Sequence, residues 1–188
     1  MLQTNLHSVP KKLILLQGID LGRGEINVMG GRMMLLPVEI LAEMVHRSGN
    51  SPEVAQLLYE SCRVTTEDHY RYMKEKKGMG EKELLDWSKE LMGFIGWGKG
   101  RYIESGVTKG NLCLEMENSS VAVEYLKKYG KSEKPVCHML CGGAAGILNA
   151  VNGRSDMVTV ETACLAKGDP KCVIIGKPRS QLAKEGKK

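Results

Sequence analysis

The chain has 188 residues, a formal net charge of +5 and 42% hydrophobic residues, which is typical of one globular domain with a hydrophobic core. No apolar run is long enough to span a membrane, and the run Leu13–Leu16 is too short for a signal peptide. Aromatic residues make up only 5%, and none is interleaved with a basic stripe. The composition therefore predicts a cytoplasmic protein that binds neither membranes nor nucleic acids, with residues 179–188 as a solvated basic tail.

The N-terminal third of the sequence is expected to hold an arm and two helices. Residues 1–30 combine an apolar segment, 13–19, that could be a strand with several glycines. A short strand is expected at 32–39 and a helix at 38–47. A longer helix should begin after Ser51, because a capping hydroxyl, a proline and an acidic residue follow one another there.

The middle of the sequence predicts a helix, two strands and two further helices. The first helix, 81–95, carries an apolar stripe at helical spacing. Strands are expected at 101–107 and 111–117, followed by a helix that Asn118, Ser119 or Ser120 can cap. The last helix, 138–152, is rich in glycine and alanine. Because each glycine costs a helix about 1 kcal/mol relative to alanine, we expect this flat face to pack closely against a neighbouring backbone.

The chain should end in a β-hairpin that brings two cysteines together. Strands are expected at 157–164 and 171–176, on either side of a Gly-Asp-Pro turn. Symmetric folding about Gly168 places Cys164 opposite Cys172, with Cβ atoms roughly 5 Å apart. This separation suits two thiolates bound to one zinc ion. Glu161 lies at an odd offset from Cys164, so it reaches the same metal only if the strand twists, bulges or ends early.

The remaining ligand of such a site is left open by spacing alone. Cys137 and Cys141 lie four residues apart at the start of the glycine-rich helix, and His138 is adjacent. Cys137 is nearer the helix N-terminus, where the helix dipole stabilises a thiolate. A disulfide between Cys164 and Cys172, or plain buried thiols, are the alternatives to a metal.

The same segments resemble a known family. PVCHMLCGGAAGILNAV, VETAC and KGDPKCVIIGKP are similar to the C-terminal core of the 4-vinyl reductase domain family, which includes the phenol-sensing domains of bacterial transcriptional activators. LLYESCR, GFIGWGKG and MENSSVAVEYLKKYG also fit, so the resemblance covers about residues 31–178. It divides the chain into an N-terminal arm, 1–30, a ligand-binding domain, 31–178, and the tail.

The resemblance implies a fold, a metal site and an assembly. The implied fold is of the α/β (α+β) type, an antiparallel sheet packed with helices and ending in a zinc-binding hairpin, similar to small subunits of the Golgi tethering complex. The implied ligands of a structural Zn²⁺ are Cys137, Glu161, Cys164 and Cys172. The family is commonly dimeric, so a homodimer is expected.

The resemblance also implies an apolar ligand pocket, which we place between the helix 81–95, the strand near 112–117 and the helix 118–129. The expected lining residues are Trp87, Leu91, Trp97, Leu114, Met116, Val121 and Tyr125. Eleven methionines against one phenylalanine suit an adaptable cavity. Together with the resemblance, the methionines therefore predict an aliphatic or mixed hydrophobic ligand in preference to phenol. The segment LCLEMEN also lacks the tryptophan expected of a phenol sensor, so the polar groups that read the effector are not matched here.

Three functions follow from these features. The first is a zinc-containing sensor or binding protein for a small hydrophobic molecule. The second is an enzyme or accessory factor that acts on tetrapyrrole vinyl groups, but the sequence contains no dinucleotide-binding fingerprint. We therefore favour a protein that is not an enzyme. The third is a scaffold subunit of the tethering type.

Overall fold

A computed structural model describes residues 19–22, 24–28, 31–103, 106–107 and 110–181. The chain divides into two compact units, Met1–Leu36 and Pro37–Lys188. Most of the strand that was considered possible at 13–19 lies outside the described residues. The boundary predicted at residue 31 between an arm and a ligand-binding domain stays a prediction.

The N-terminal unit contains a three-stranded antiparallel sheet. Its strands are β1 (Ile19–Gly22), β2 (Glu25–Val28) and β3 (Gly31–Met33), in that order. β3 is much shorter than the strand predicted at 32–39. Pro37 lacks a backbone N–H for a sheet, and it stands instead at the N-cap of the next helix.

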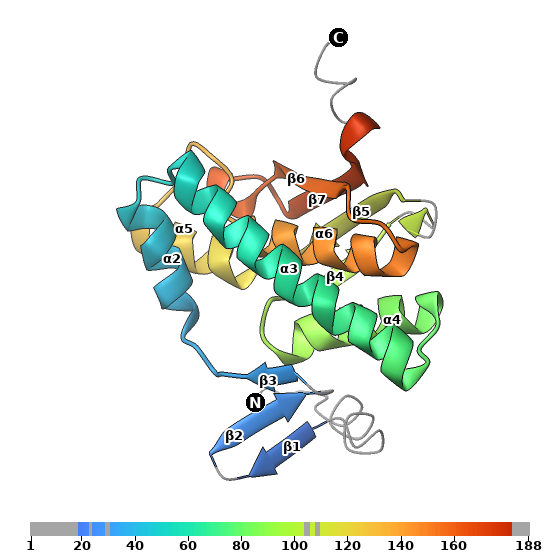
Figure 1. Cartoon of the computed structure of the whole chain (residues 1–188). Coiled ribbons are helices and arrows are strands. Elements are labelled where there is room, and N and C mark those ends of the chain that lie inside the picture. The colour runs from blue at the N-terminus through green and yellow to red at the C-terminus, as the bar shows by residue number, and fades with distance from the viewer. Residues whose placement is uncertain (1–18, 23, 29–30, 104–105, 108–109, 182–188) are drawn as a thin grey trace. The chain divides into compact units, whose positions relative to one another are not determined.

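The C-terminal unit contains the helices that the periodicity predicted (Figure 1). They are α2 (Val38–Arg47), α3 (Pro52–Lys77), α4 (Glu81–Phe94), α5 (Ser120–Tyr129) and α6 (His138–Asn152). The Ser51 hydroxyl accepts a hydrogen bond from the Val54 N–H at 3.4 Å, which confirms it as the cap of α3. Among the described residues, no helix is both long and apolar enough to cross a membrane.

The C-terminal unit also contains a four-stranded antiparallel sheet. Its strands are β4 (Gly100–Tyr102), β5 (Leu112–Met116), β6 (Met157–Ala163) and β7 (Cys172–Pro178), and their order in the sheet is β4-β5-β7-β6. A short 3-10 helix, η2 (Leu165–Lys167), joins β6 to β7. Residues of β5 alternate between buried and half-buried, as predicted. The predicted class, a mixed α/β fold with an antiparallel sheet and helices, is confirmed.

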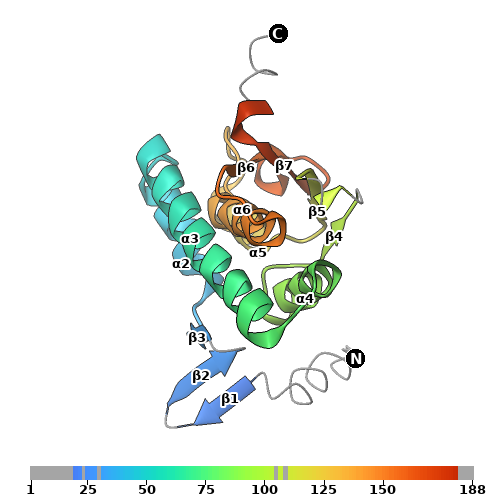
Figure 2. The same ribbon diagram turned by 45° about the vertical axis from the view of Figure 1, so that its right-hand side comes forward.

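Helix α6 packs between α3 and the sheet (Figure 2). A Cβ atom on Gly146 would lie 2.5 Å from the carbonyl oxygen of Arg63, and one on Gly142 would collide with the carbonyl oxygen of Tyr59. Both oxygens belong to the backbone of α3, so only glycine permits this approach. The close packing predicted for the small-residue face is confirmed, and it fixes the helix at whose start Cys137 lies.

Candidate metal site and apolar cavity

Four side chains converge where the start of α6 meets the hairpin β6-η2-β7. Cys137 is the N-cap residue of α6, Glu161 lies in β6, Cys164 directly follows β6, and Cys172 opens β7. Their Sγ and carboxylate oxygen atoms all lie within 4.8 Å of one another. The three cysteines are buried, and Glu161 is partly buried. The structure thus brings together all four residues that the sequence resemblance named.

A β-bulge explains how Glu161 reaches the cluster. From Met157 to Glu161 the strand β6 pairs with β7 in one register, and between Glu161 and Ala163 the register shifts. An extra residue in one strand changes the direction of the side chains that follow. Symmetric pairing was therefore wrong along most of the hairpin, because Glu161 lies opposite Ile174 and one position away from the predicted partner. The bulge supplies the irregularity that the odd offset required.

Backbone groups hold the donors in place. The N–H of Cys137 donates to Oε2 of Glu161 at 3.0 Å, and the N–H of Leu165 donates to Sγ of Cys172 at 3.3 Å. The N–H of Cys164 donates to the carboxylate of Asp169 at 2.7 Å, which ties down the turn. Oε1 of Glu161 is buried and has no hydrogen-bond partner. A buried carboxylate oxygen without a partner is unfavourable, and a cation would satisfy it.

The protonation of the cluster also favours a cation. Burial, followed by the charge of Cys164, raises the pKa of Glu161 to about 8. Contacts with Cys164 and Cys172, followed by burial, raise the pKa of the Cys137 thiol. Without a positive ion, the site therefore resists several negative charges close together. A bound divalent cation reverses this preference, because it stabilises deprotonated ligands.

The donor set fits a tetrahedral metal ion. Two thiolates at 2.3 Å from a tetrahedral zinc ion lie about 3.8 Å apart, and the Sγ atoms of Cys137 and Cys172 are separated by 3.7 Å. None of the six cysteines, all of which are described, forms a disulfide. Nε2 of His138 is 2.6 Å from Oδ1 of Asn50, and Cys141 lies outside the cluster. Cys137, Glu161, Cys164 and Cys172 could therefore bind a metal ion.

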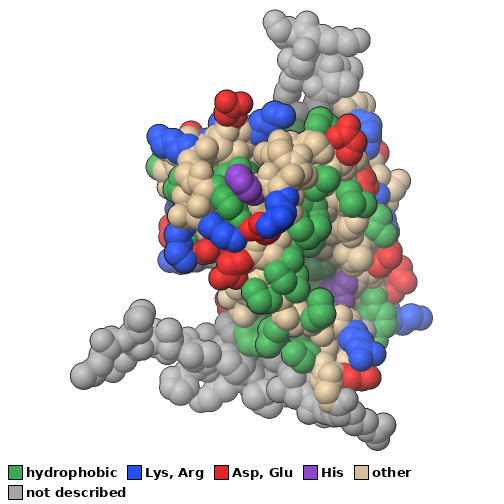
Figure 3. Space-filling model, turned by 90° about the vertical axis from the view of Figure 1, so that its left-hand side faces the viewer, with side chains coloured by type: hydrophobic (Ala, Val, Ile, Leu, Met, Phe, Trp, Pro, Cys, Tyr) green, Lys and Arg blue, Asp and Glu red, His purple; other side chains and the backbone are tan. Residues whose placement is uncertain are grey.

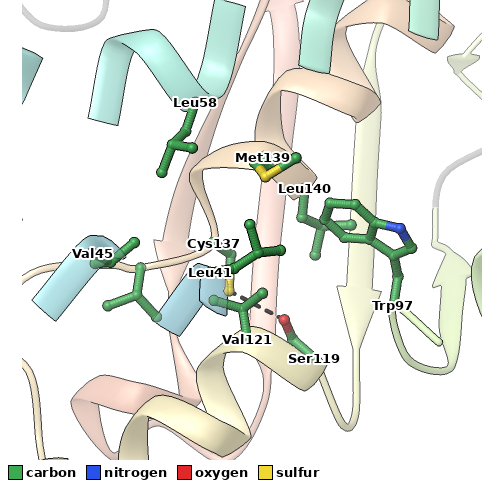
Figure 4. A pocket seen from close by; sticks show the side chains of 10 residues that line it. Leu41, Val45, Leu58, Trp97, Ser119, Val121, Cys137, Met139 and Leu140 are labelled. Carbon is green, nitrogen blue, oxygen red and sulfur yellow. Dashed lines mark hydrogen bonds between the residues drawn. The ribbon is translucent and has the colours of Figure 1, made fainter. Parts of the chain in front are cut away.

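A small cavity adjoins the metal cluster (Figure 4). Its volume is about 10 Å³, close to what one water molecule needs. The cavity is lined by Leu41, Val45, Leu58, Trp97, Ser119, Val121, Val136, Cys137, Met139 and Leu140. Leu41, Trp97 and Met139 are half-buried, whereas the other lining residues are buried. Cys137 thus belongs both to the metal cluster and to the wall of the cavity.

The pocket residues named from the sequence fall into two groups. Trp97 and Val121 line the cavity. The other five, which are buried but are not among the residues that line it, are Trp87, Leu91, Leu114, Met116 and Tyr125. A Cβ atom on Gly100 would contact Met92, Leu114 and Met116, so flexible side chains close around the start of β4.

A buried polar group in the same region was not predicted. The hydroxyls of Ser88 in α4 and Tyr102 in β4 lie 2.6 Å apart, and Ser88 also donates to the carbonyl oxygen of Leu85. Burial raises the pKa of Tyr102 to about 12, so this hydroxyl keeps its proton. Ser88 stands one helical turn from Leu84 and from Met92 on the buried stripe of α4. A polar residue in an apolar stripe is the signal that could have revealed it.

Ser119 stands where a cap was predicted, but its side-chain contact was not foreseen. The sequence suggested Asn118, Ser119 or Ser120 as a cap, and Ser119 does stand at the N-cap of α5, but its side chain makes no capping hydrogen bond. Its Oγ lies 3.2 Å from Sγ of Cys137 instead. The side chain of Asn118 accepts a hydrogen bond from the N–H of Lys99.

The fold and the four-donor cluster define a helix-covered antiparallel sheet with a candidate metal site at its last hairpin. The solved sensory domain of the transcription activator PoxR, described as phenol-responsive and crystallised with phenol, has this fold, with a TM-score of 0.74. The two chains are 20% identical, and the match covers 94% of this chain and 92% of the other. A vinyl-4-reductase family protein from Methanocaldococcus jannaschii matches with a TM-score of 0.53 and 15% identity, over 78% of this chain and 83% of the other. The fold resemblance seen in the sequence is confirmed.

Two further comparisons add detail. The phenol regulator MopR of Acinetobacter guillouiae is 44% identical over 64 residues, which are 34% of this chain but only 11% of the regulator. A trafficking protein particle complex subunit 3 from Naegleria fowleri, covalently bound to palmitic acid, reaches a TM-score of only 0.49 at 10% identity, over 75% of this chain and 92% of the other. A scan against models of protein families found no match.

Proposed function

We propose that this chain is a cytoplasmic sensory domain that binds a small, mainly apolar molecule and is stabilised by one structural zinc ion. The observation that carries the proposal is the local 44% identity to a phenol regulator, in a chain whose fold matches a phenol-responsive sensory domain over 94% of its length. The ligand-binding part is proposed to be residues 31–178.

Zinc is the metal that this donor set favours. Thiolates select soft or borderline ions, and three thiolates with one carboxylate complete a tetrahedral site. Because all four positions are filled by the protein, the site is closed and its role is structural. Elemental analysis of freshly purified, unchelated protein should find one zinc per chain. A metal-free preparation that is folded and stable would contradict this proposal.

The ligand is proposed to enter between α4, β5 and α5, with the cavity at Trp97 and Val121 at one end of that region. Buried side chains and few polar groups are typical of small-molecule sites, and methionines can move to admit a ligand. The hydroxyls of Ser88 and Tyr102, which are hydrogen-bonded to each other, are buried polar groups of the same region. The relatives support a small aromatic molecule such as phenol, whereas the missing tryptophan supports an aliphatic one.

A thermal-shift screen decides between these ligands. Phenol and aliphatic alcohols of similar size should be compared at equal concentration. A ligand at 100 times its dissociation constant stabilises the folded state by about 2.7 kcal/mol. Hits among phenols alone would correct the preference for aliphatic ligands, and a screen without any hit would favour a scaffold function. A coloured purified protein would instead indicate a bound tetrapyrrole.

We also propose that the chain forms a homodimer. Ile40 and Met44 of α2 are 43% and 42% exposed, and Leu57 of α3 is 62% exposed. Figure 3 shows hydrophobic side chains at the surface of the face that carries α2. Such patches often mark protein interfaces, and twofold pairs are the commonest assembly. Light scattering over a range of concentrations should report a dimer; a monomer throughout would refute it.

A further inference from the structure

The hydroxyl of Ser119 does not cap the helix at whose N-terminus it lies. A serine at a helix N-cap normally accepts a hydrogen bond from the backbone of the first turn, but Ser119 does not. Its Oγ lies 3.2 Å from Sγ of Cys137, and the residue is only 2% exposed (Figure 4). The side chain of Ser119 therefore contacts a member of the metal cluster instead of capping its own helix.

The direction of this hydrogen bond follows from the chemistry of a metal ligand. A metal-bound cysteine is a thiolate, which can accept a hydrogen bond but has no proton to donate. The hydroxyl of Ser119 must then be the donor. The backbone N–H of the same cysteine donates to Glu161. Partners outside the coordination shell orient ligands in this way, and their loss typically weakens metal binding 10- to 100-fold.

Ser119 also faces the cavity. A serine hydroxyl has one proton and two lone pairs. When the proton is directed to Cys137, the oxygen can still accept a hydrogen bond from a group inside the cavity. Cys137 apart, the other residues that line the cavity are hydrophobic. As it stands, the cavity holds about one water molecule. A small apolar molecule with one hydroxyl group matches the lining in chemistry, and it enters when the half-buried side chains of Leu41, Trp97 and Met139 move aside.

We infer that Ser119 is a positioning residue that couples the ligand cavity to the metal site. The hydroxyl of the ligand donates to Oγ of Ser119, and Ser119 donates to the metal-bound sulfur of Cys137. Ligand and metal then strengthen each other's binding, and the coupling must be equal in both directions. The coupling rests on the proposed ligand-binding function, whereas the contact between Ser119 and Cys137 stands on the geometry alone.

The first experiment measures zinc release to an excess of a coloured chelator. Ser119→Ala should release zinc about 10 times faster than the unchanged protein, and Ser119→Thr, which keeps the hydroxyl, should restore slow release. Ser120→Ala is the matched control, because Ser120 is the next residue and neither lines the cavity nor belongs to the cluster. Ser119 makes no capping bond, so Ser119→Ala should fold normally. Equal release rates for Ser119→Ala and the unchanged protein would overturn the positioning role.

The second experiment repeats the measurement with phenol as the probe. Phenol should slow zinc release about fivefold in the unchanged protein and should have no effect in Ser119→Ala. If phenol raises the unfolding temperature but leaves zinc release unchanged, the coupling is wrong and the proposed function stands. An equal slowing in both proteins overturns the relay through Ser119. If phenol changes neither quantity, the coupling to a phenol-like ligand fails together with that part of the proposed function.

Discussion

The metal cluster and the cavity share Cys137, yet they are built on different principles. The cluster takes four donors of a distinctive type from one hairpin and one helix start, and its donor atoms lie within 4.8 Å of one another. The cavity takes ordinary hydrophobic side chains from α2, α3, α5, α6 and the segment after α4. Residue types and spacing identify the first kind of site. Only the packed structure reveals the second.

Removing a metal ligand should have the largest effect. Cys172→Ser takes a thiolate out of the cluster, and metal binding at such sites contributes on the order of 10 kcal/mol to folding. Because that exceeds the stability of many domains, the variant should lose zinc and unfold or aggregate. Cys141→Ser should keep zinc, since Cys141 lies outside the cluster. Zinc content and circular dichroism check both, and zinc loss in Cys141→Ser alone would overturn the ligand assignment.

A change in the middle of α6 should affect both sites together, because this helix supplies Cys137 to one and Leu140 to the other. In Gly146→Ala the new Cβ would lie 2.5 Å from a carbonyl oxygen of α3, and such overpacking costs about 1–3 kcal/mol. In Gly143→Ala the nearest atom is the sulfur of Cys62, at 3.5 Å. This control should gain up to about 1 kcal/mol of helix stability. Urea unfolding of the zinc-loaded proteins measures both; equal midpoints would mean that α3 moves away at little cost.

The difference between the metal cluster and the cavity also explains how much of the structure the sequence could predict. The helices α2 to α6 were located because their apolar residues recur at helical spacing and their ends carry caps or glycines. The strand at 32–39 was too long because Pro37 serves the following helix. The register of the hairpin was wrong by one residue before the bulge, since a single inserted residue leaves no mark in an alternating pattern.

In the candidate sites, too, residue types and spacing reveal some features, and only the packed structure reveals the others. Glu161 could be assigned to the cluster only through the resemblance, because its spacing alone argued against it. The two serines were missed for different reasons. Ser88 lies in an apolar stripe where a polar residue could have been noticed, whereas Ser119 looked like an ordinary cap. Its contact with Cys137 joins residues 18 positions apart, which only the tertiary structure brings together.

A cavity-filling variant should separate ligand binding from the metal. Val121→Ile adds one methylene to a buried residue that lines the cavity. The change should weaken binding of a small ligand about tenfold, because even one methylene matters in a space that holds about one water molecule. Stability should change by less than about 1.5 kcal/mol. Val123→Ile, at a residue of the same helix that is 43% exposed, is the control. Calorimetric titration with phenol should show weaker binding only in the first variant, with zinc content unchanged in both; unchanged binding in Val121→Ile would move the ligand away from this cavity.

The smallest effect on stability is expected for Glu43, on the outer side of α2. The same helix supplies Leu41 and Val45 to the cavity. Hydrogen bonds from Lys128, then Tyr129 and then Arg47 lower the pKa of Glu43 from 4.5 to about 2. Because the folded state lowers this pKa, the resulting stability is present above pH 4.5 and is lost as the pH falls towards 2.

Glu43→Gln should therefore unfold at a lower urea concentration than the unchanged protein at pH 7, and the difference should shrink as the pH falls below 4.5. The difference should be small, since exposed ion pairs contribute little. Glu39→Gln, on the same helix, is the control for the loss of one carboxylate from α2. The comparison covers the pH range in which all three proteins keep zinc and stay folded, because loss of zinc in stronger acid would unfold them all. A difference in urea midpoint that stays constant as the pH falls below 4.5 would show that the carboxylate of Glu43 does not hold α2 against α5.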